Sequence, residues 1–142
     1  MVQTKFQVLL LGSDAKLLDA VSAAIQPAGG TVTFAANLPD LSRLIQSQGP
    51  DLLLLDLKST GSESLDWLQQ HQQNPPAKPI FTVAIAPGKH DPELLLKVSE
   101  AGVNQLLAYP GPGQEMFRAQ LEATCQLKRR NDELLQRVQE QL

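Results

Sequence analysis

Asp56 is the residue of this 142-residue chain that is best placed to do chemistry. It follows four consecutive leucines, Leu52–Leu55, in a run that begins after Pro50 and ends before a serine, threonine and glycine cluster at 59–62. A short, continuously apolar run is typical of a strand that is buried on both faces. In an open α/β sheet, ligands bind at the carboxyl ends of such strands. The pattern therefore predicts a carboxylate at the functional edge of a sheet.

Lys58 stands two residues beyond Asp56, and side chains at positions i and i+2 of an extended segment share a face. Two arrangements are open. In the first, the Lys58 ammonium approaches the Asp56 carboxylate and acts as a counter-charge, which would favour the ionised carboxylate. In the second, Lys58 is a solvated loop lysine.

Cys125 and His71 could also carry chemistry, but their surroundings in the sequence argue against it. Cys125 is the single cysteine and falls in a helical pattern away from any histidine, which predicts a small buried residue. His71 lies near the polar end of a predicted helix without a second type of metal ligand nearby. We expect it to be a surface residue, because metal sites need clusters of ligands.

The net charge of −3 argues against a generic surface for nucleic acid or anionic membrane. The partners expected are therefore proteins or small molecules, with no nucleic acid and no membrane. Uninterrupted apolar runs are only a few residues long, far short of the roughly 20 that span a bilayer. No signal-peptide pattern opens the chain, so we expect a cytoplasmic protein.

Five strand signals alternate with five helix signals, joined by short loops. Apolar or β-branched runs predict the strands, at 6–11, 31–35, 51–56, 80–85 and 104–108. Apolar residues at helical spacing predict the helices, at 15–26, 38–48, 63–73, 92–101 and 114–142. Asp14, Asn37 and Asp91 are the predicted helix caps, Gly102 the predicted left-handed end of the fourth helix, and 58–62 a loop. The alternation predicts an α/β fold in which a parallel sheet has helices on both faces.

The last helical pattern is far longer than the roughly 10–14 residues of an average helix. It divides the chain into a predicted domain, 1–125, and an extension, 126–142, that projects outward and could link to an output domain. Four positions continue a spacing of three and four residues along the extension, which predicts a short coiled coil: Asn131, Leu135, Val138 and Leu142. Two predicted i, i+4 ion pairs support the helix: Lys128 with Asp132 and Arg129 with Glu133. A tail without a partner is the alternative.

The order of these elements, with an acid ending the third strand, resembles the receiver domain of bacterial response regulators over roughly residues 5–125. Further similarities occur in the family's order: Ser64 eight positions after Asp56, Pro79–Ile80 opening the fourth strand, Ala101–Gly102 before the fifth strand and Pro110 after it. The resemblance implies a flavodoxin-like (βα)5 three-layer sandwich with the sheet order 2-1-3-4-5.

The resemblance also implies a role for Asp56. In the family this carboxylate takes a phosphoryl group from a histidine kinase or a small phosphodonor, and Mg²⁺ neutralises the charge. Two acids after the first strand help to hold the metal, and those positions match Gly12 and Ser13, which offer no carboxylate to a hard cation. Asp14 is one residue late. It could reach the site only through a rearranged loop, and its position favours a helix cap.

Three other positions of the family's site are also changed. The Ser/Thr at the end of the fourth strand, which senses the phosphoryl group, matches Ala84, whose methyl group cannot hydrogen-bond a phosphate. The lysine before Pro110 matches Tyr109, which is neutral near pH 7. The aromatic switch residue matches Leu106. Of these functional positions, the sequence retains only Asp56.

The leading prediction is therefore a degenerate receiver, or pseudo-receiver, of a two-component phosphorelay. It would act through protein contacts and without a cofactor. The resemblance implies that its contact surface is the face made by the fourth helix, fifth strand and fifth helix. Its expected partners are a sensor histidine kinase or another signalling protein, and a second copy through the last helix. A second prediction keeps Asp56 as a phosphoacceptor with a compensating Mg²⁺ site. A third, a nucleotide or flavin binder, rests on Gly12-Ser13-Asp14 alone, without a dinucleotide fingerprint or a Walker lysine.

Overall fold

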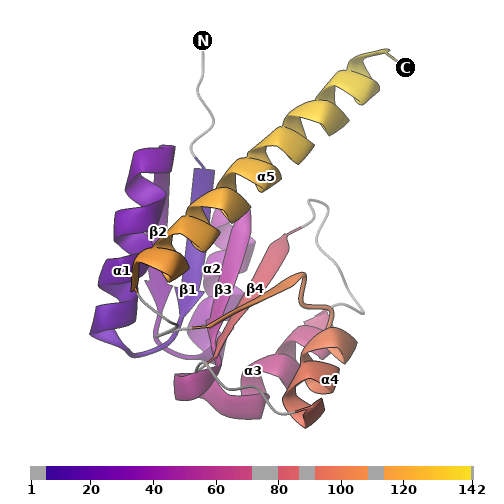
Figure 1. Ribbon diagram of the computed structural model, residues 1–142. Helices are drawn as coiled ribbons and strands as arrows, with labels where there is room; N and C mark the ends of the chain where they lie inside the picture. Colours follow the sequence, from indigo (N-terminus) through magenta and orange to yellow (C-terminus); the bar gives the residue numbers. More distant parts are fainter. Residues whose placement is uncertain (1–5, 72–79, 87–91, 109–113, 142) are drawn as a thin grey trace.

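The computed structural model describes residues 6–71, 80–86, 92–108 and 114–141. Within them, five parallel strands form one sheet in the predicted order β2-β1-β3-β4-β5 (Figure 1). The strands are β1 (Phe6–Leu11), β2 (Gly30–Ala35), β3 (Leu52–Asp56), β4 (Phe81–Ala86) and β5 (Gln105–Ala108). The strand register places β3 between β1 and β4, so the leucine run is the central strand of the sheet.

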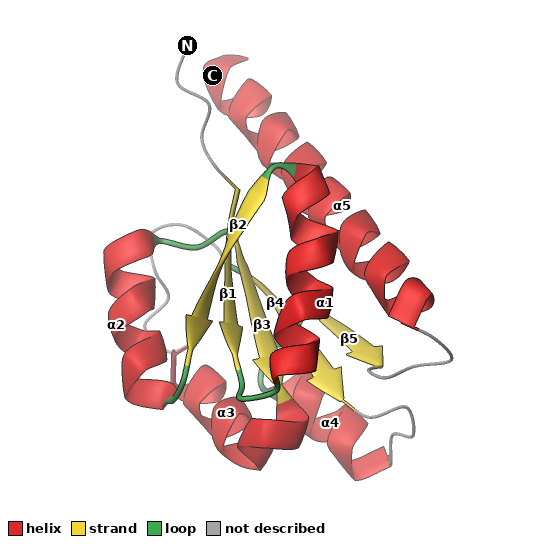
Figure 2. Ribbon diagram, turned by 90° about the vertical axis from the view of Figure 1, so that its left-hand side faces the viewer, coloured by secondary structure: helices red, strands yellow, loops and turns green. Residues whose placement is uncertain are grey.

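Helices cover both faces of the sheet, which confirms the three-layer prediction (Figure 2). Their bounds are α1 (Ala15–Ile25), α2 (Leu38–Gln48), α3 (Leu57–His71), α4 (Pro92–Glu100) and α5 (Gln114–Gln141), and a short 3-10 turn, Gln26–Ala28, follows α1. One core lies under α1 and α5 and the other lies under α2, α3 and α4.

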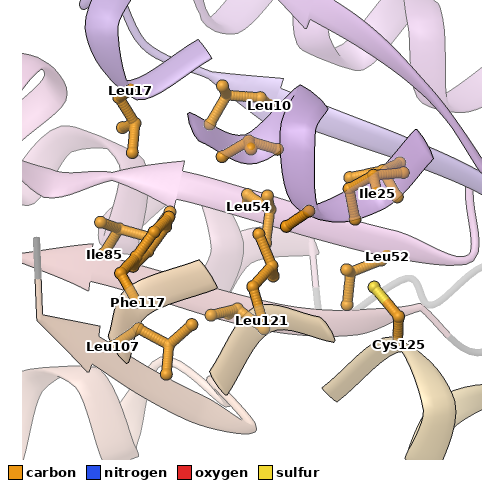
Figure 3. Packing of buried hydrophobic residues seen from close by; sticks show 14 of the residues in the cluster. Leu10, Leu17, Ile25, Leu52, Leu54, Ile85, Leu107, Phe117, Leu121 and Cys125 are labelled. Carbon is orange, nitrogen blue, oxygen red and sulfur yellow. The ribbon is translucent and has the colours of Figure 1, made fainter. Parts of the chain in front are cut away.

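The four leucines of β3 supply both cores. Leu52 and Leu54 pack under α1 and α5, and Leu53 and Leu55 pack under α2, α3 and α4. This division follows from the strand geometry, in which successive side chains point to opposite faces. None of the four is more than 1% exposed, as predicted for a strand buried on both sides. Figure 3 shows Leu52 and Leu54 among the side chains of the first core.

Several helix ends follow the local sequence signals. The Asn37 side chain caps α2 by accepting a hydrogen bond from the Asp40 N–H at 2.8 Å. Gly102 follows α4 with φ of 88°, a left-handed conformation that glycine adopts without steric cost. Asp91, the predicted cap of α4, lies outside the described residues.

The predicted loop at 58–62 is wrong. Helix α3 begins at Leu57, directly after β3, and its first turn is interrupted at Gly61, with φ of 60° and ψ of −150°. That conformation is open essentially to glycine alone. The serine and threonine residues that suggested a loop instead make hydrogen bonds within this first turn.

Helix α5 is 28 residues long, about 42 Å at 1.5 Å per residue, and it runs past the edge of the sheet (Figure 1). The predicted ion pair between Lys128 and Asp132 is present at 2.9 Å. The predicted pair between Arg129 and Glu133 is wrong: Arg129 lies over the ring of Phe6, 5.2 Å from its centroid. The arginine is drawn to the start of β1 because an aromatic face attracts a cation.

Within the described ranges, no helix is both long enough and apolar enough to cross a membrane.

Cys125 is fully buried on the sheet-facing side of α5, beside Leu52 (Figure 3). Burial raises the pKa of its thiol from 9.0 to about 11. The thiolate is the reactive form of cysteine, so a buried thiol with a raised pKa is a poor nucleophile. The structure thus agrees with the prediction of a small buried residue.

We expect Cys125 to resist a thiol reagent such as dithionitrobenzoate in the folded protein at about pH 8 and to react fully in denaturant. The folded state holds this proton more tightly than the unfolded state. The contribution of the thiol to stability is therefore full below about pH 9 and is lost as the pH rises through about 11. The Cys125→Ala variant measures the background reaction, and rapid stoichiometric labelling without denaturant would contradict the expectation.

Candidate functional site

Asp56 is the last residue of β3 and is 3% exposed, at the carboxyl edge of the sheet. Its Oδ1 accepts a hydrogen bond from the backbone N–H of Lys58 at 3.2 Å. Its Oδ2 accepts a hydrogen bond from the Ser59 hydroxyl at 2.6 Å. Both donors belong to the first turn of α3, so the carboxylate acts as a helix N-cap as well as ending the strand.

Ser59 connects two segments that are far apart in the chain. Its hydroxyl donates to Asp56 and accepts a hydrogen bond from the backbone N–H of Ser13 at 3.4 Å. The carboxylate of β3 is thereby linked to the loop that follows β1. Ser59 was not among the predicted site residues. Its spacing of three residues from Asp56 is similar to that of a capping box and could have indicated the contact.

The turn after Asp56 has further internal hydrogen bonds. The Thr60 hydroxyl donates to the backbone carbonyl of Asp56 at 2.8 Å, and the Ser64 hydroxyl donates to the carbonyl of Gly61 at 3.1 Å. Ser64, a small residue that the family resemblance singled out, is fully buried where α3 resumes after Gly61. These bonds hold the backbone on both sides of the break in α3.

Gly12 lies against the Asp56 side chain. A Cβ atom added at Gly12 would stand 2.8 Å from the Cβ of Asp56 and 3.1 Å from its Oδ2. Real Cβ atoms essentially never show a contact under 3.0 Å, so any larger residue at position 12 would require Asp56 or the β1 backbone to shift. The absence of a side chain at Gly12 is what lets the carboxylate take this place.

Asp14 is engaged at the start of α1. Its Oδ1 accepts hydrogen bonds from the backbone N–H groups of Lys16 at 2.9 Å and Leu17 at 3.4 Å, as the sequence predicted for a helix cap. This use satisfies orphan donors at the start of the helix.

These residues do not fit the Mg²⁺ site that the fold implies. Gly12 and Ser13 carry no carboxylate, Asp14 caps α1, and both oxygens of Asp56 accept hydrogen bonds from α3. Mg²⁺ demands nearly octahedral oxygen coordination and is usually held by one or two carboxylates. Among the described residues, no group of three or more His, Cys, Asp or Glu side chains could hold a metal ion.

Lys58 contacts the Asp56 carboxylate through its backbone N–H, and its side chain is exposed. In the described part of the chain, no ion pair joins the Lys58 ammonium to Asp56. The approach of the Lys58 ammonium to Asp56 as a counter-charge stays a prediction, which the stability of the Lys58→Ala variant tests.

Ala84 lies inside β4 rather than at its end, fully buried and opposite Leu55 in the strand register. The strand continues to Ala86, one residue beyond the partner of Asp56, so Ala86 is the residue at the edge. The Pro87 that follows could have marked this end in the sequence. Either residue offers only a methyl group. Leu106 pairs with Ala84 from β5 and is half-buried, whereas Tyr109 and Pro110 lie outside the described residues.

The structure is similar to solved response regulators. The chemotaxis response regulator CheY4 of Vibrio cholerae matches with a TM-score of 0.71 at 19% identity, covering 88% of this chain and 99% of that one. A signal receiver domain from Bermanella marisrubri matches with a TM-score of 0.65 at 19% identity, covering 96% of this chain and 98% of that one. The signal receiver domain of an HD domain-containing protein from Pseudomonas fluorescens matches with a TM-score of 0.68 at 21% identity, covering 92% of this chain and 96% of that one. This protein thus has the receiver-domain fold.

No protein-family model and no curated protein matches the sequence.

Replacing Gly12 by alanine should destabilise the protein by about 1–3 kcal/mol, because the new methyl group overpacks the contact with Asp56. Urea unfolding followed by circular dichroism measures the loss. The matched control is Ser13→Ala, an exposed neighbouring position where we expect a change within about 0.5 kcal/mol. A Gly12→Ala variant as stable as the native protein would show that Asp56 does not lie against Gly12.

Replacing Asp56 by alanine removes the acceptor of two hydrogen bonds and should cost about 1–2 kcal/mol of stability. Asp56→Asn should cost less, because its carbonyl oxygen can still cap Lys58 N–H. If the Lys58 side chain contributes nothing to this site, Lys58→Ala should stay within about 0.5 kcal/mol of the native protein, since its backbone donor remains. A larger loss for Lys58→Ala, absent when Asp56 is also Asn, would support the counter-charge.

Proposed function

We propose that this protein is a receiver-type module of two-component signal transduction that works through protein contacts, with impaired or no Mg²⁺-dependent phosphorylation. The observation that carries the proposal is the packing of the Asp56 carboxylate against Gly12, where the two metal-binding acids of a receiver would begin. A phosphoryl acceptor needs a free oxygen and a cation to neutralise the incoming charge. Here both oxygens of Asp56 are hydrogen-bonded, and in the described ranges no group of three or more His, Cys, Asp or Glu side chains could hold a cation.

The proposed partners are a sensor histidine kinase or another signalling protein, and a second copy of this chain. The similarity to receiver domains supports the first, as these are the domains of response regulators. The proposed contact surface includes α4, β5 and α5. It has exposed large apolar side chains at Leu95 and Leu96 of α4 and at Met116 of α5. In this proposal, residues 1–125 form the receiver and 126–142 extend its last helix.

The alternative in which Asp56 is a working phosphoacceptor requires the first turn of α3 to release the carboxylate and a loop movement to bring Asp14 closer. A nucleotide or flavin binder on the same sheet edge would instead show flavin absorbance or a thermal shift with nucleotides. The hydrogen bonds of Asp14 and Asp56 support neither arrangement.

We expect the protein to keep its native mass after incubation with acetyl phosphate and Mg²⁺, as measured by intact mass spectrometry. A receiver that is known to be phosphorylated, treated in parallel, controls for the reagent, and Asp56→Asn controls for the site. An adduct of one phosphoryl group that forms as readily as in the control receiver and disappears in Asp56→Asn would refute the proposal and establish the phosphoacceptor alternative.

A further inference from the structure

Helix α5 leaves its own domain before it ends. Its inner face packs on the sheet through Phe117, Leu121 and Cys125, which are all buried. Beyond Asp132, every described residue of the helix, 133–141, is exposed. Figure 1 shows the end of α5 projecting past the sheet. Isolated helices of this size are marginal in water, and most helical stability in proteins comes from packing an apolar face. The exposed turns therefore call for a partner that covers their apolar side chains.

Four large apolar side chains are exposed between residues 127 and 138, and three of them form a stripe: Leu127, Leu134 and Val138, which are 64%, 51% and 56% exposed. The fourth, Leu135, is 58% exposed and lies beside the stripe. At 3.6 residues per turn the stripe lies about a quarter turn from the buried face, so it points along the side of the domain rather than into it. Asn131, also exposed, falls on the same stripe between Leu127 and Leu134. The four positions have the spacing of a coiled-coil seam.

The stripe predicted from the sequence, through Asn131, Leu135 and Val138, begins differently. One heptad before Leu135 that seam would use Lys128, whose side chain is 10% exposed and paired with Asp132. Lys128 is therefore packed against the domain, and a seam through this position would face the domain's own core. Leu127, one residue earlier, is free on the outer side of the helix, so the structure favours the seam that contains it.

We infer that a second copy of this chain binds along this seam as a parallel two-stranded coiled coil. In the heptad notation, Leu127 and Leu134 occupy d positions and Asn131 and Val138 occupy a positions. Leucine at d with a β-branched residue at a favours two parallel strands, and a single buried asparagine at a specifies register and oligomer state. The inference rests on the proposed function, because it names the second copy included there and defines its contact.

The charges beside the seam agree with the parallel orientation. Arg130 and Arg137 occupy the two g positions, and Leu135 occupies an e position. In a parallel pair, g faces e of the other helix, so Arg130 lies beside Leu135 of the second copy and its apolar stem can cover it. An antiparallel pair would place the g arginines of the two helices opposite each other, and like charges in contact repel.

The geometry of the domain leaves room for this contact. Helix α5 runs opposite to the strands and extends past their amino ends, away from the edge that holds Asp56 (Figures 1 and 2). Two copies joined there in parallel would hold both Asp56 edges on the same side of the pair and free of the interface.

The first experiment compares two neighbouring leucines of nearly equal exposure. We expect the full chain to dimerise with rising concentration in analytical ultracentrifugation, and Leu134→Glu to raise the dissociation constant by about tenfold or more. Leu135→Glu is the matched control: it should leave the dimer intact or tighten it, because the new carboxylate faces Arg130 of the second copy. Circular dichroism checks that both variants stay folded.

The second experiment tests orientation by disulfide cross-linking. Cysteines at the same a position meet in a parallel, in-register pair, so Val138→Cys should form a linked dimer on mild oxidation. Gln136→Cys, on the outer side of the same helix, should link far less. The native chain, whose buried Cys125 is inaccessible, should not link.

Three results would overturn the inference: a monomer at every concentration reached, a loss of the dimer in Leu135→Glu equal to that in Leu134→Glu, or a dimer in which Val138→Cys does not cross-link. None of them bears on phosphorylation. A phosphoryl adduct on Asp56 would refute the inactive site and leave the seam unaffected, so the two proposals fail separately.

Discussion

Burial of β3 on both faces is the constraint on which the rest of the structure depends. Its four leucines fill two separate cores, and each fully buried leucine contributes about 1.5–3 kcal/mol relative to an exposed one. A shift of the strand by one residue would still place leucines on both faces, but it would bring Asp51 or Asp56 into a core position that a leucine now fills, at the cost of burying a charge. The strand is therefore held in register between β1 and β4, and Asp56 is held at the edge of the sheet.

The chemistry of that edge follows from what surrounds Asp56. Because Gly12 has no side chain, the Asp56 carboxylate can pack against β1. Because α3 begins at the next residue, Leu57, two hydrogen-bond donors of its first turn lie within reach of the carboxylate. A carboxylate at position 12 could not stand in the same space. Gly12 thus determines the packing of this site as well as its charge. Through its hydrogen bonds, Asp56 joins β3 to α3 and, by way of Ser59, to the β1–α1 loop.

Helix α5 packs on the domain as far as Asp132 and is exposed over its last nine residues, 133–141. Arg129 over Phe6 secures the helix where the sheet ends, and Lys128, whose side chain is 10% exposed, pairs with Asp132 within the helix itself. Because Lys128 and Arg129 face the domain, three of the four exposed large apolar side chains, Leu127, Leu134 and Val138, lie together on another side of the helix. The fold of one copy therefore selects the face that another copy can use.

By itself, the sequence determined the kinds of element, their order, and several of their ends. Apolar periodicity, the Asn37 cap and the left-handed Gly102 act over a few neighbouring residues, so each can be recognised within one segment. The absence of a carboxylate at Gly12 and Ser13 was equally visible, because it is a matter of residue type. The tertiary structure alone decided that Ser59 bonds Asp56 and reaches Ser13, 46 residues away, that Arg129 turns to Phe6, and which stripe of α5 stays free. Such contacts join segments distant in the chain, and their geometry exists only once both segments are packed on the same core.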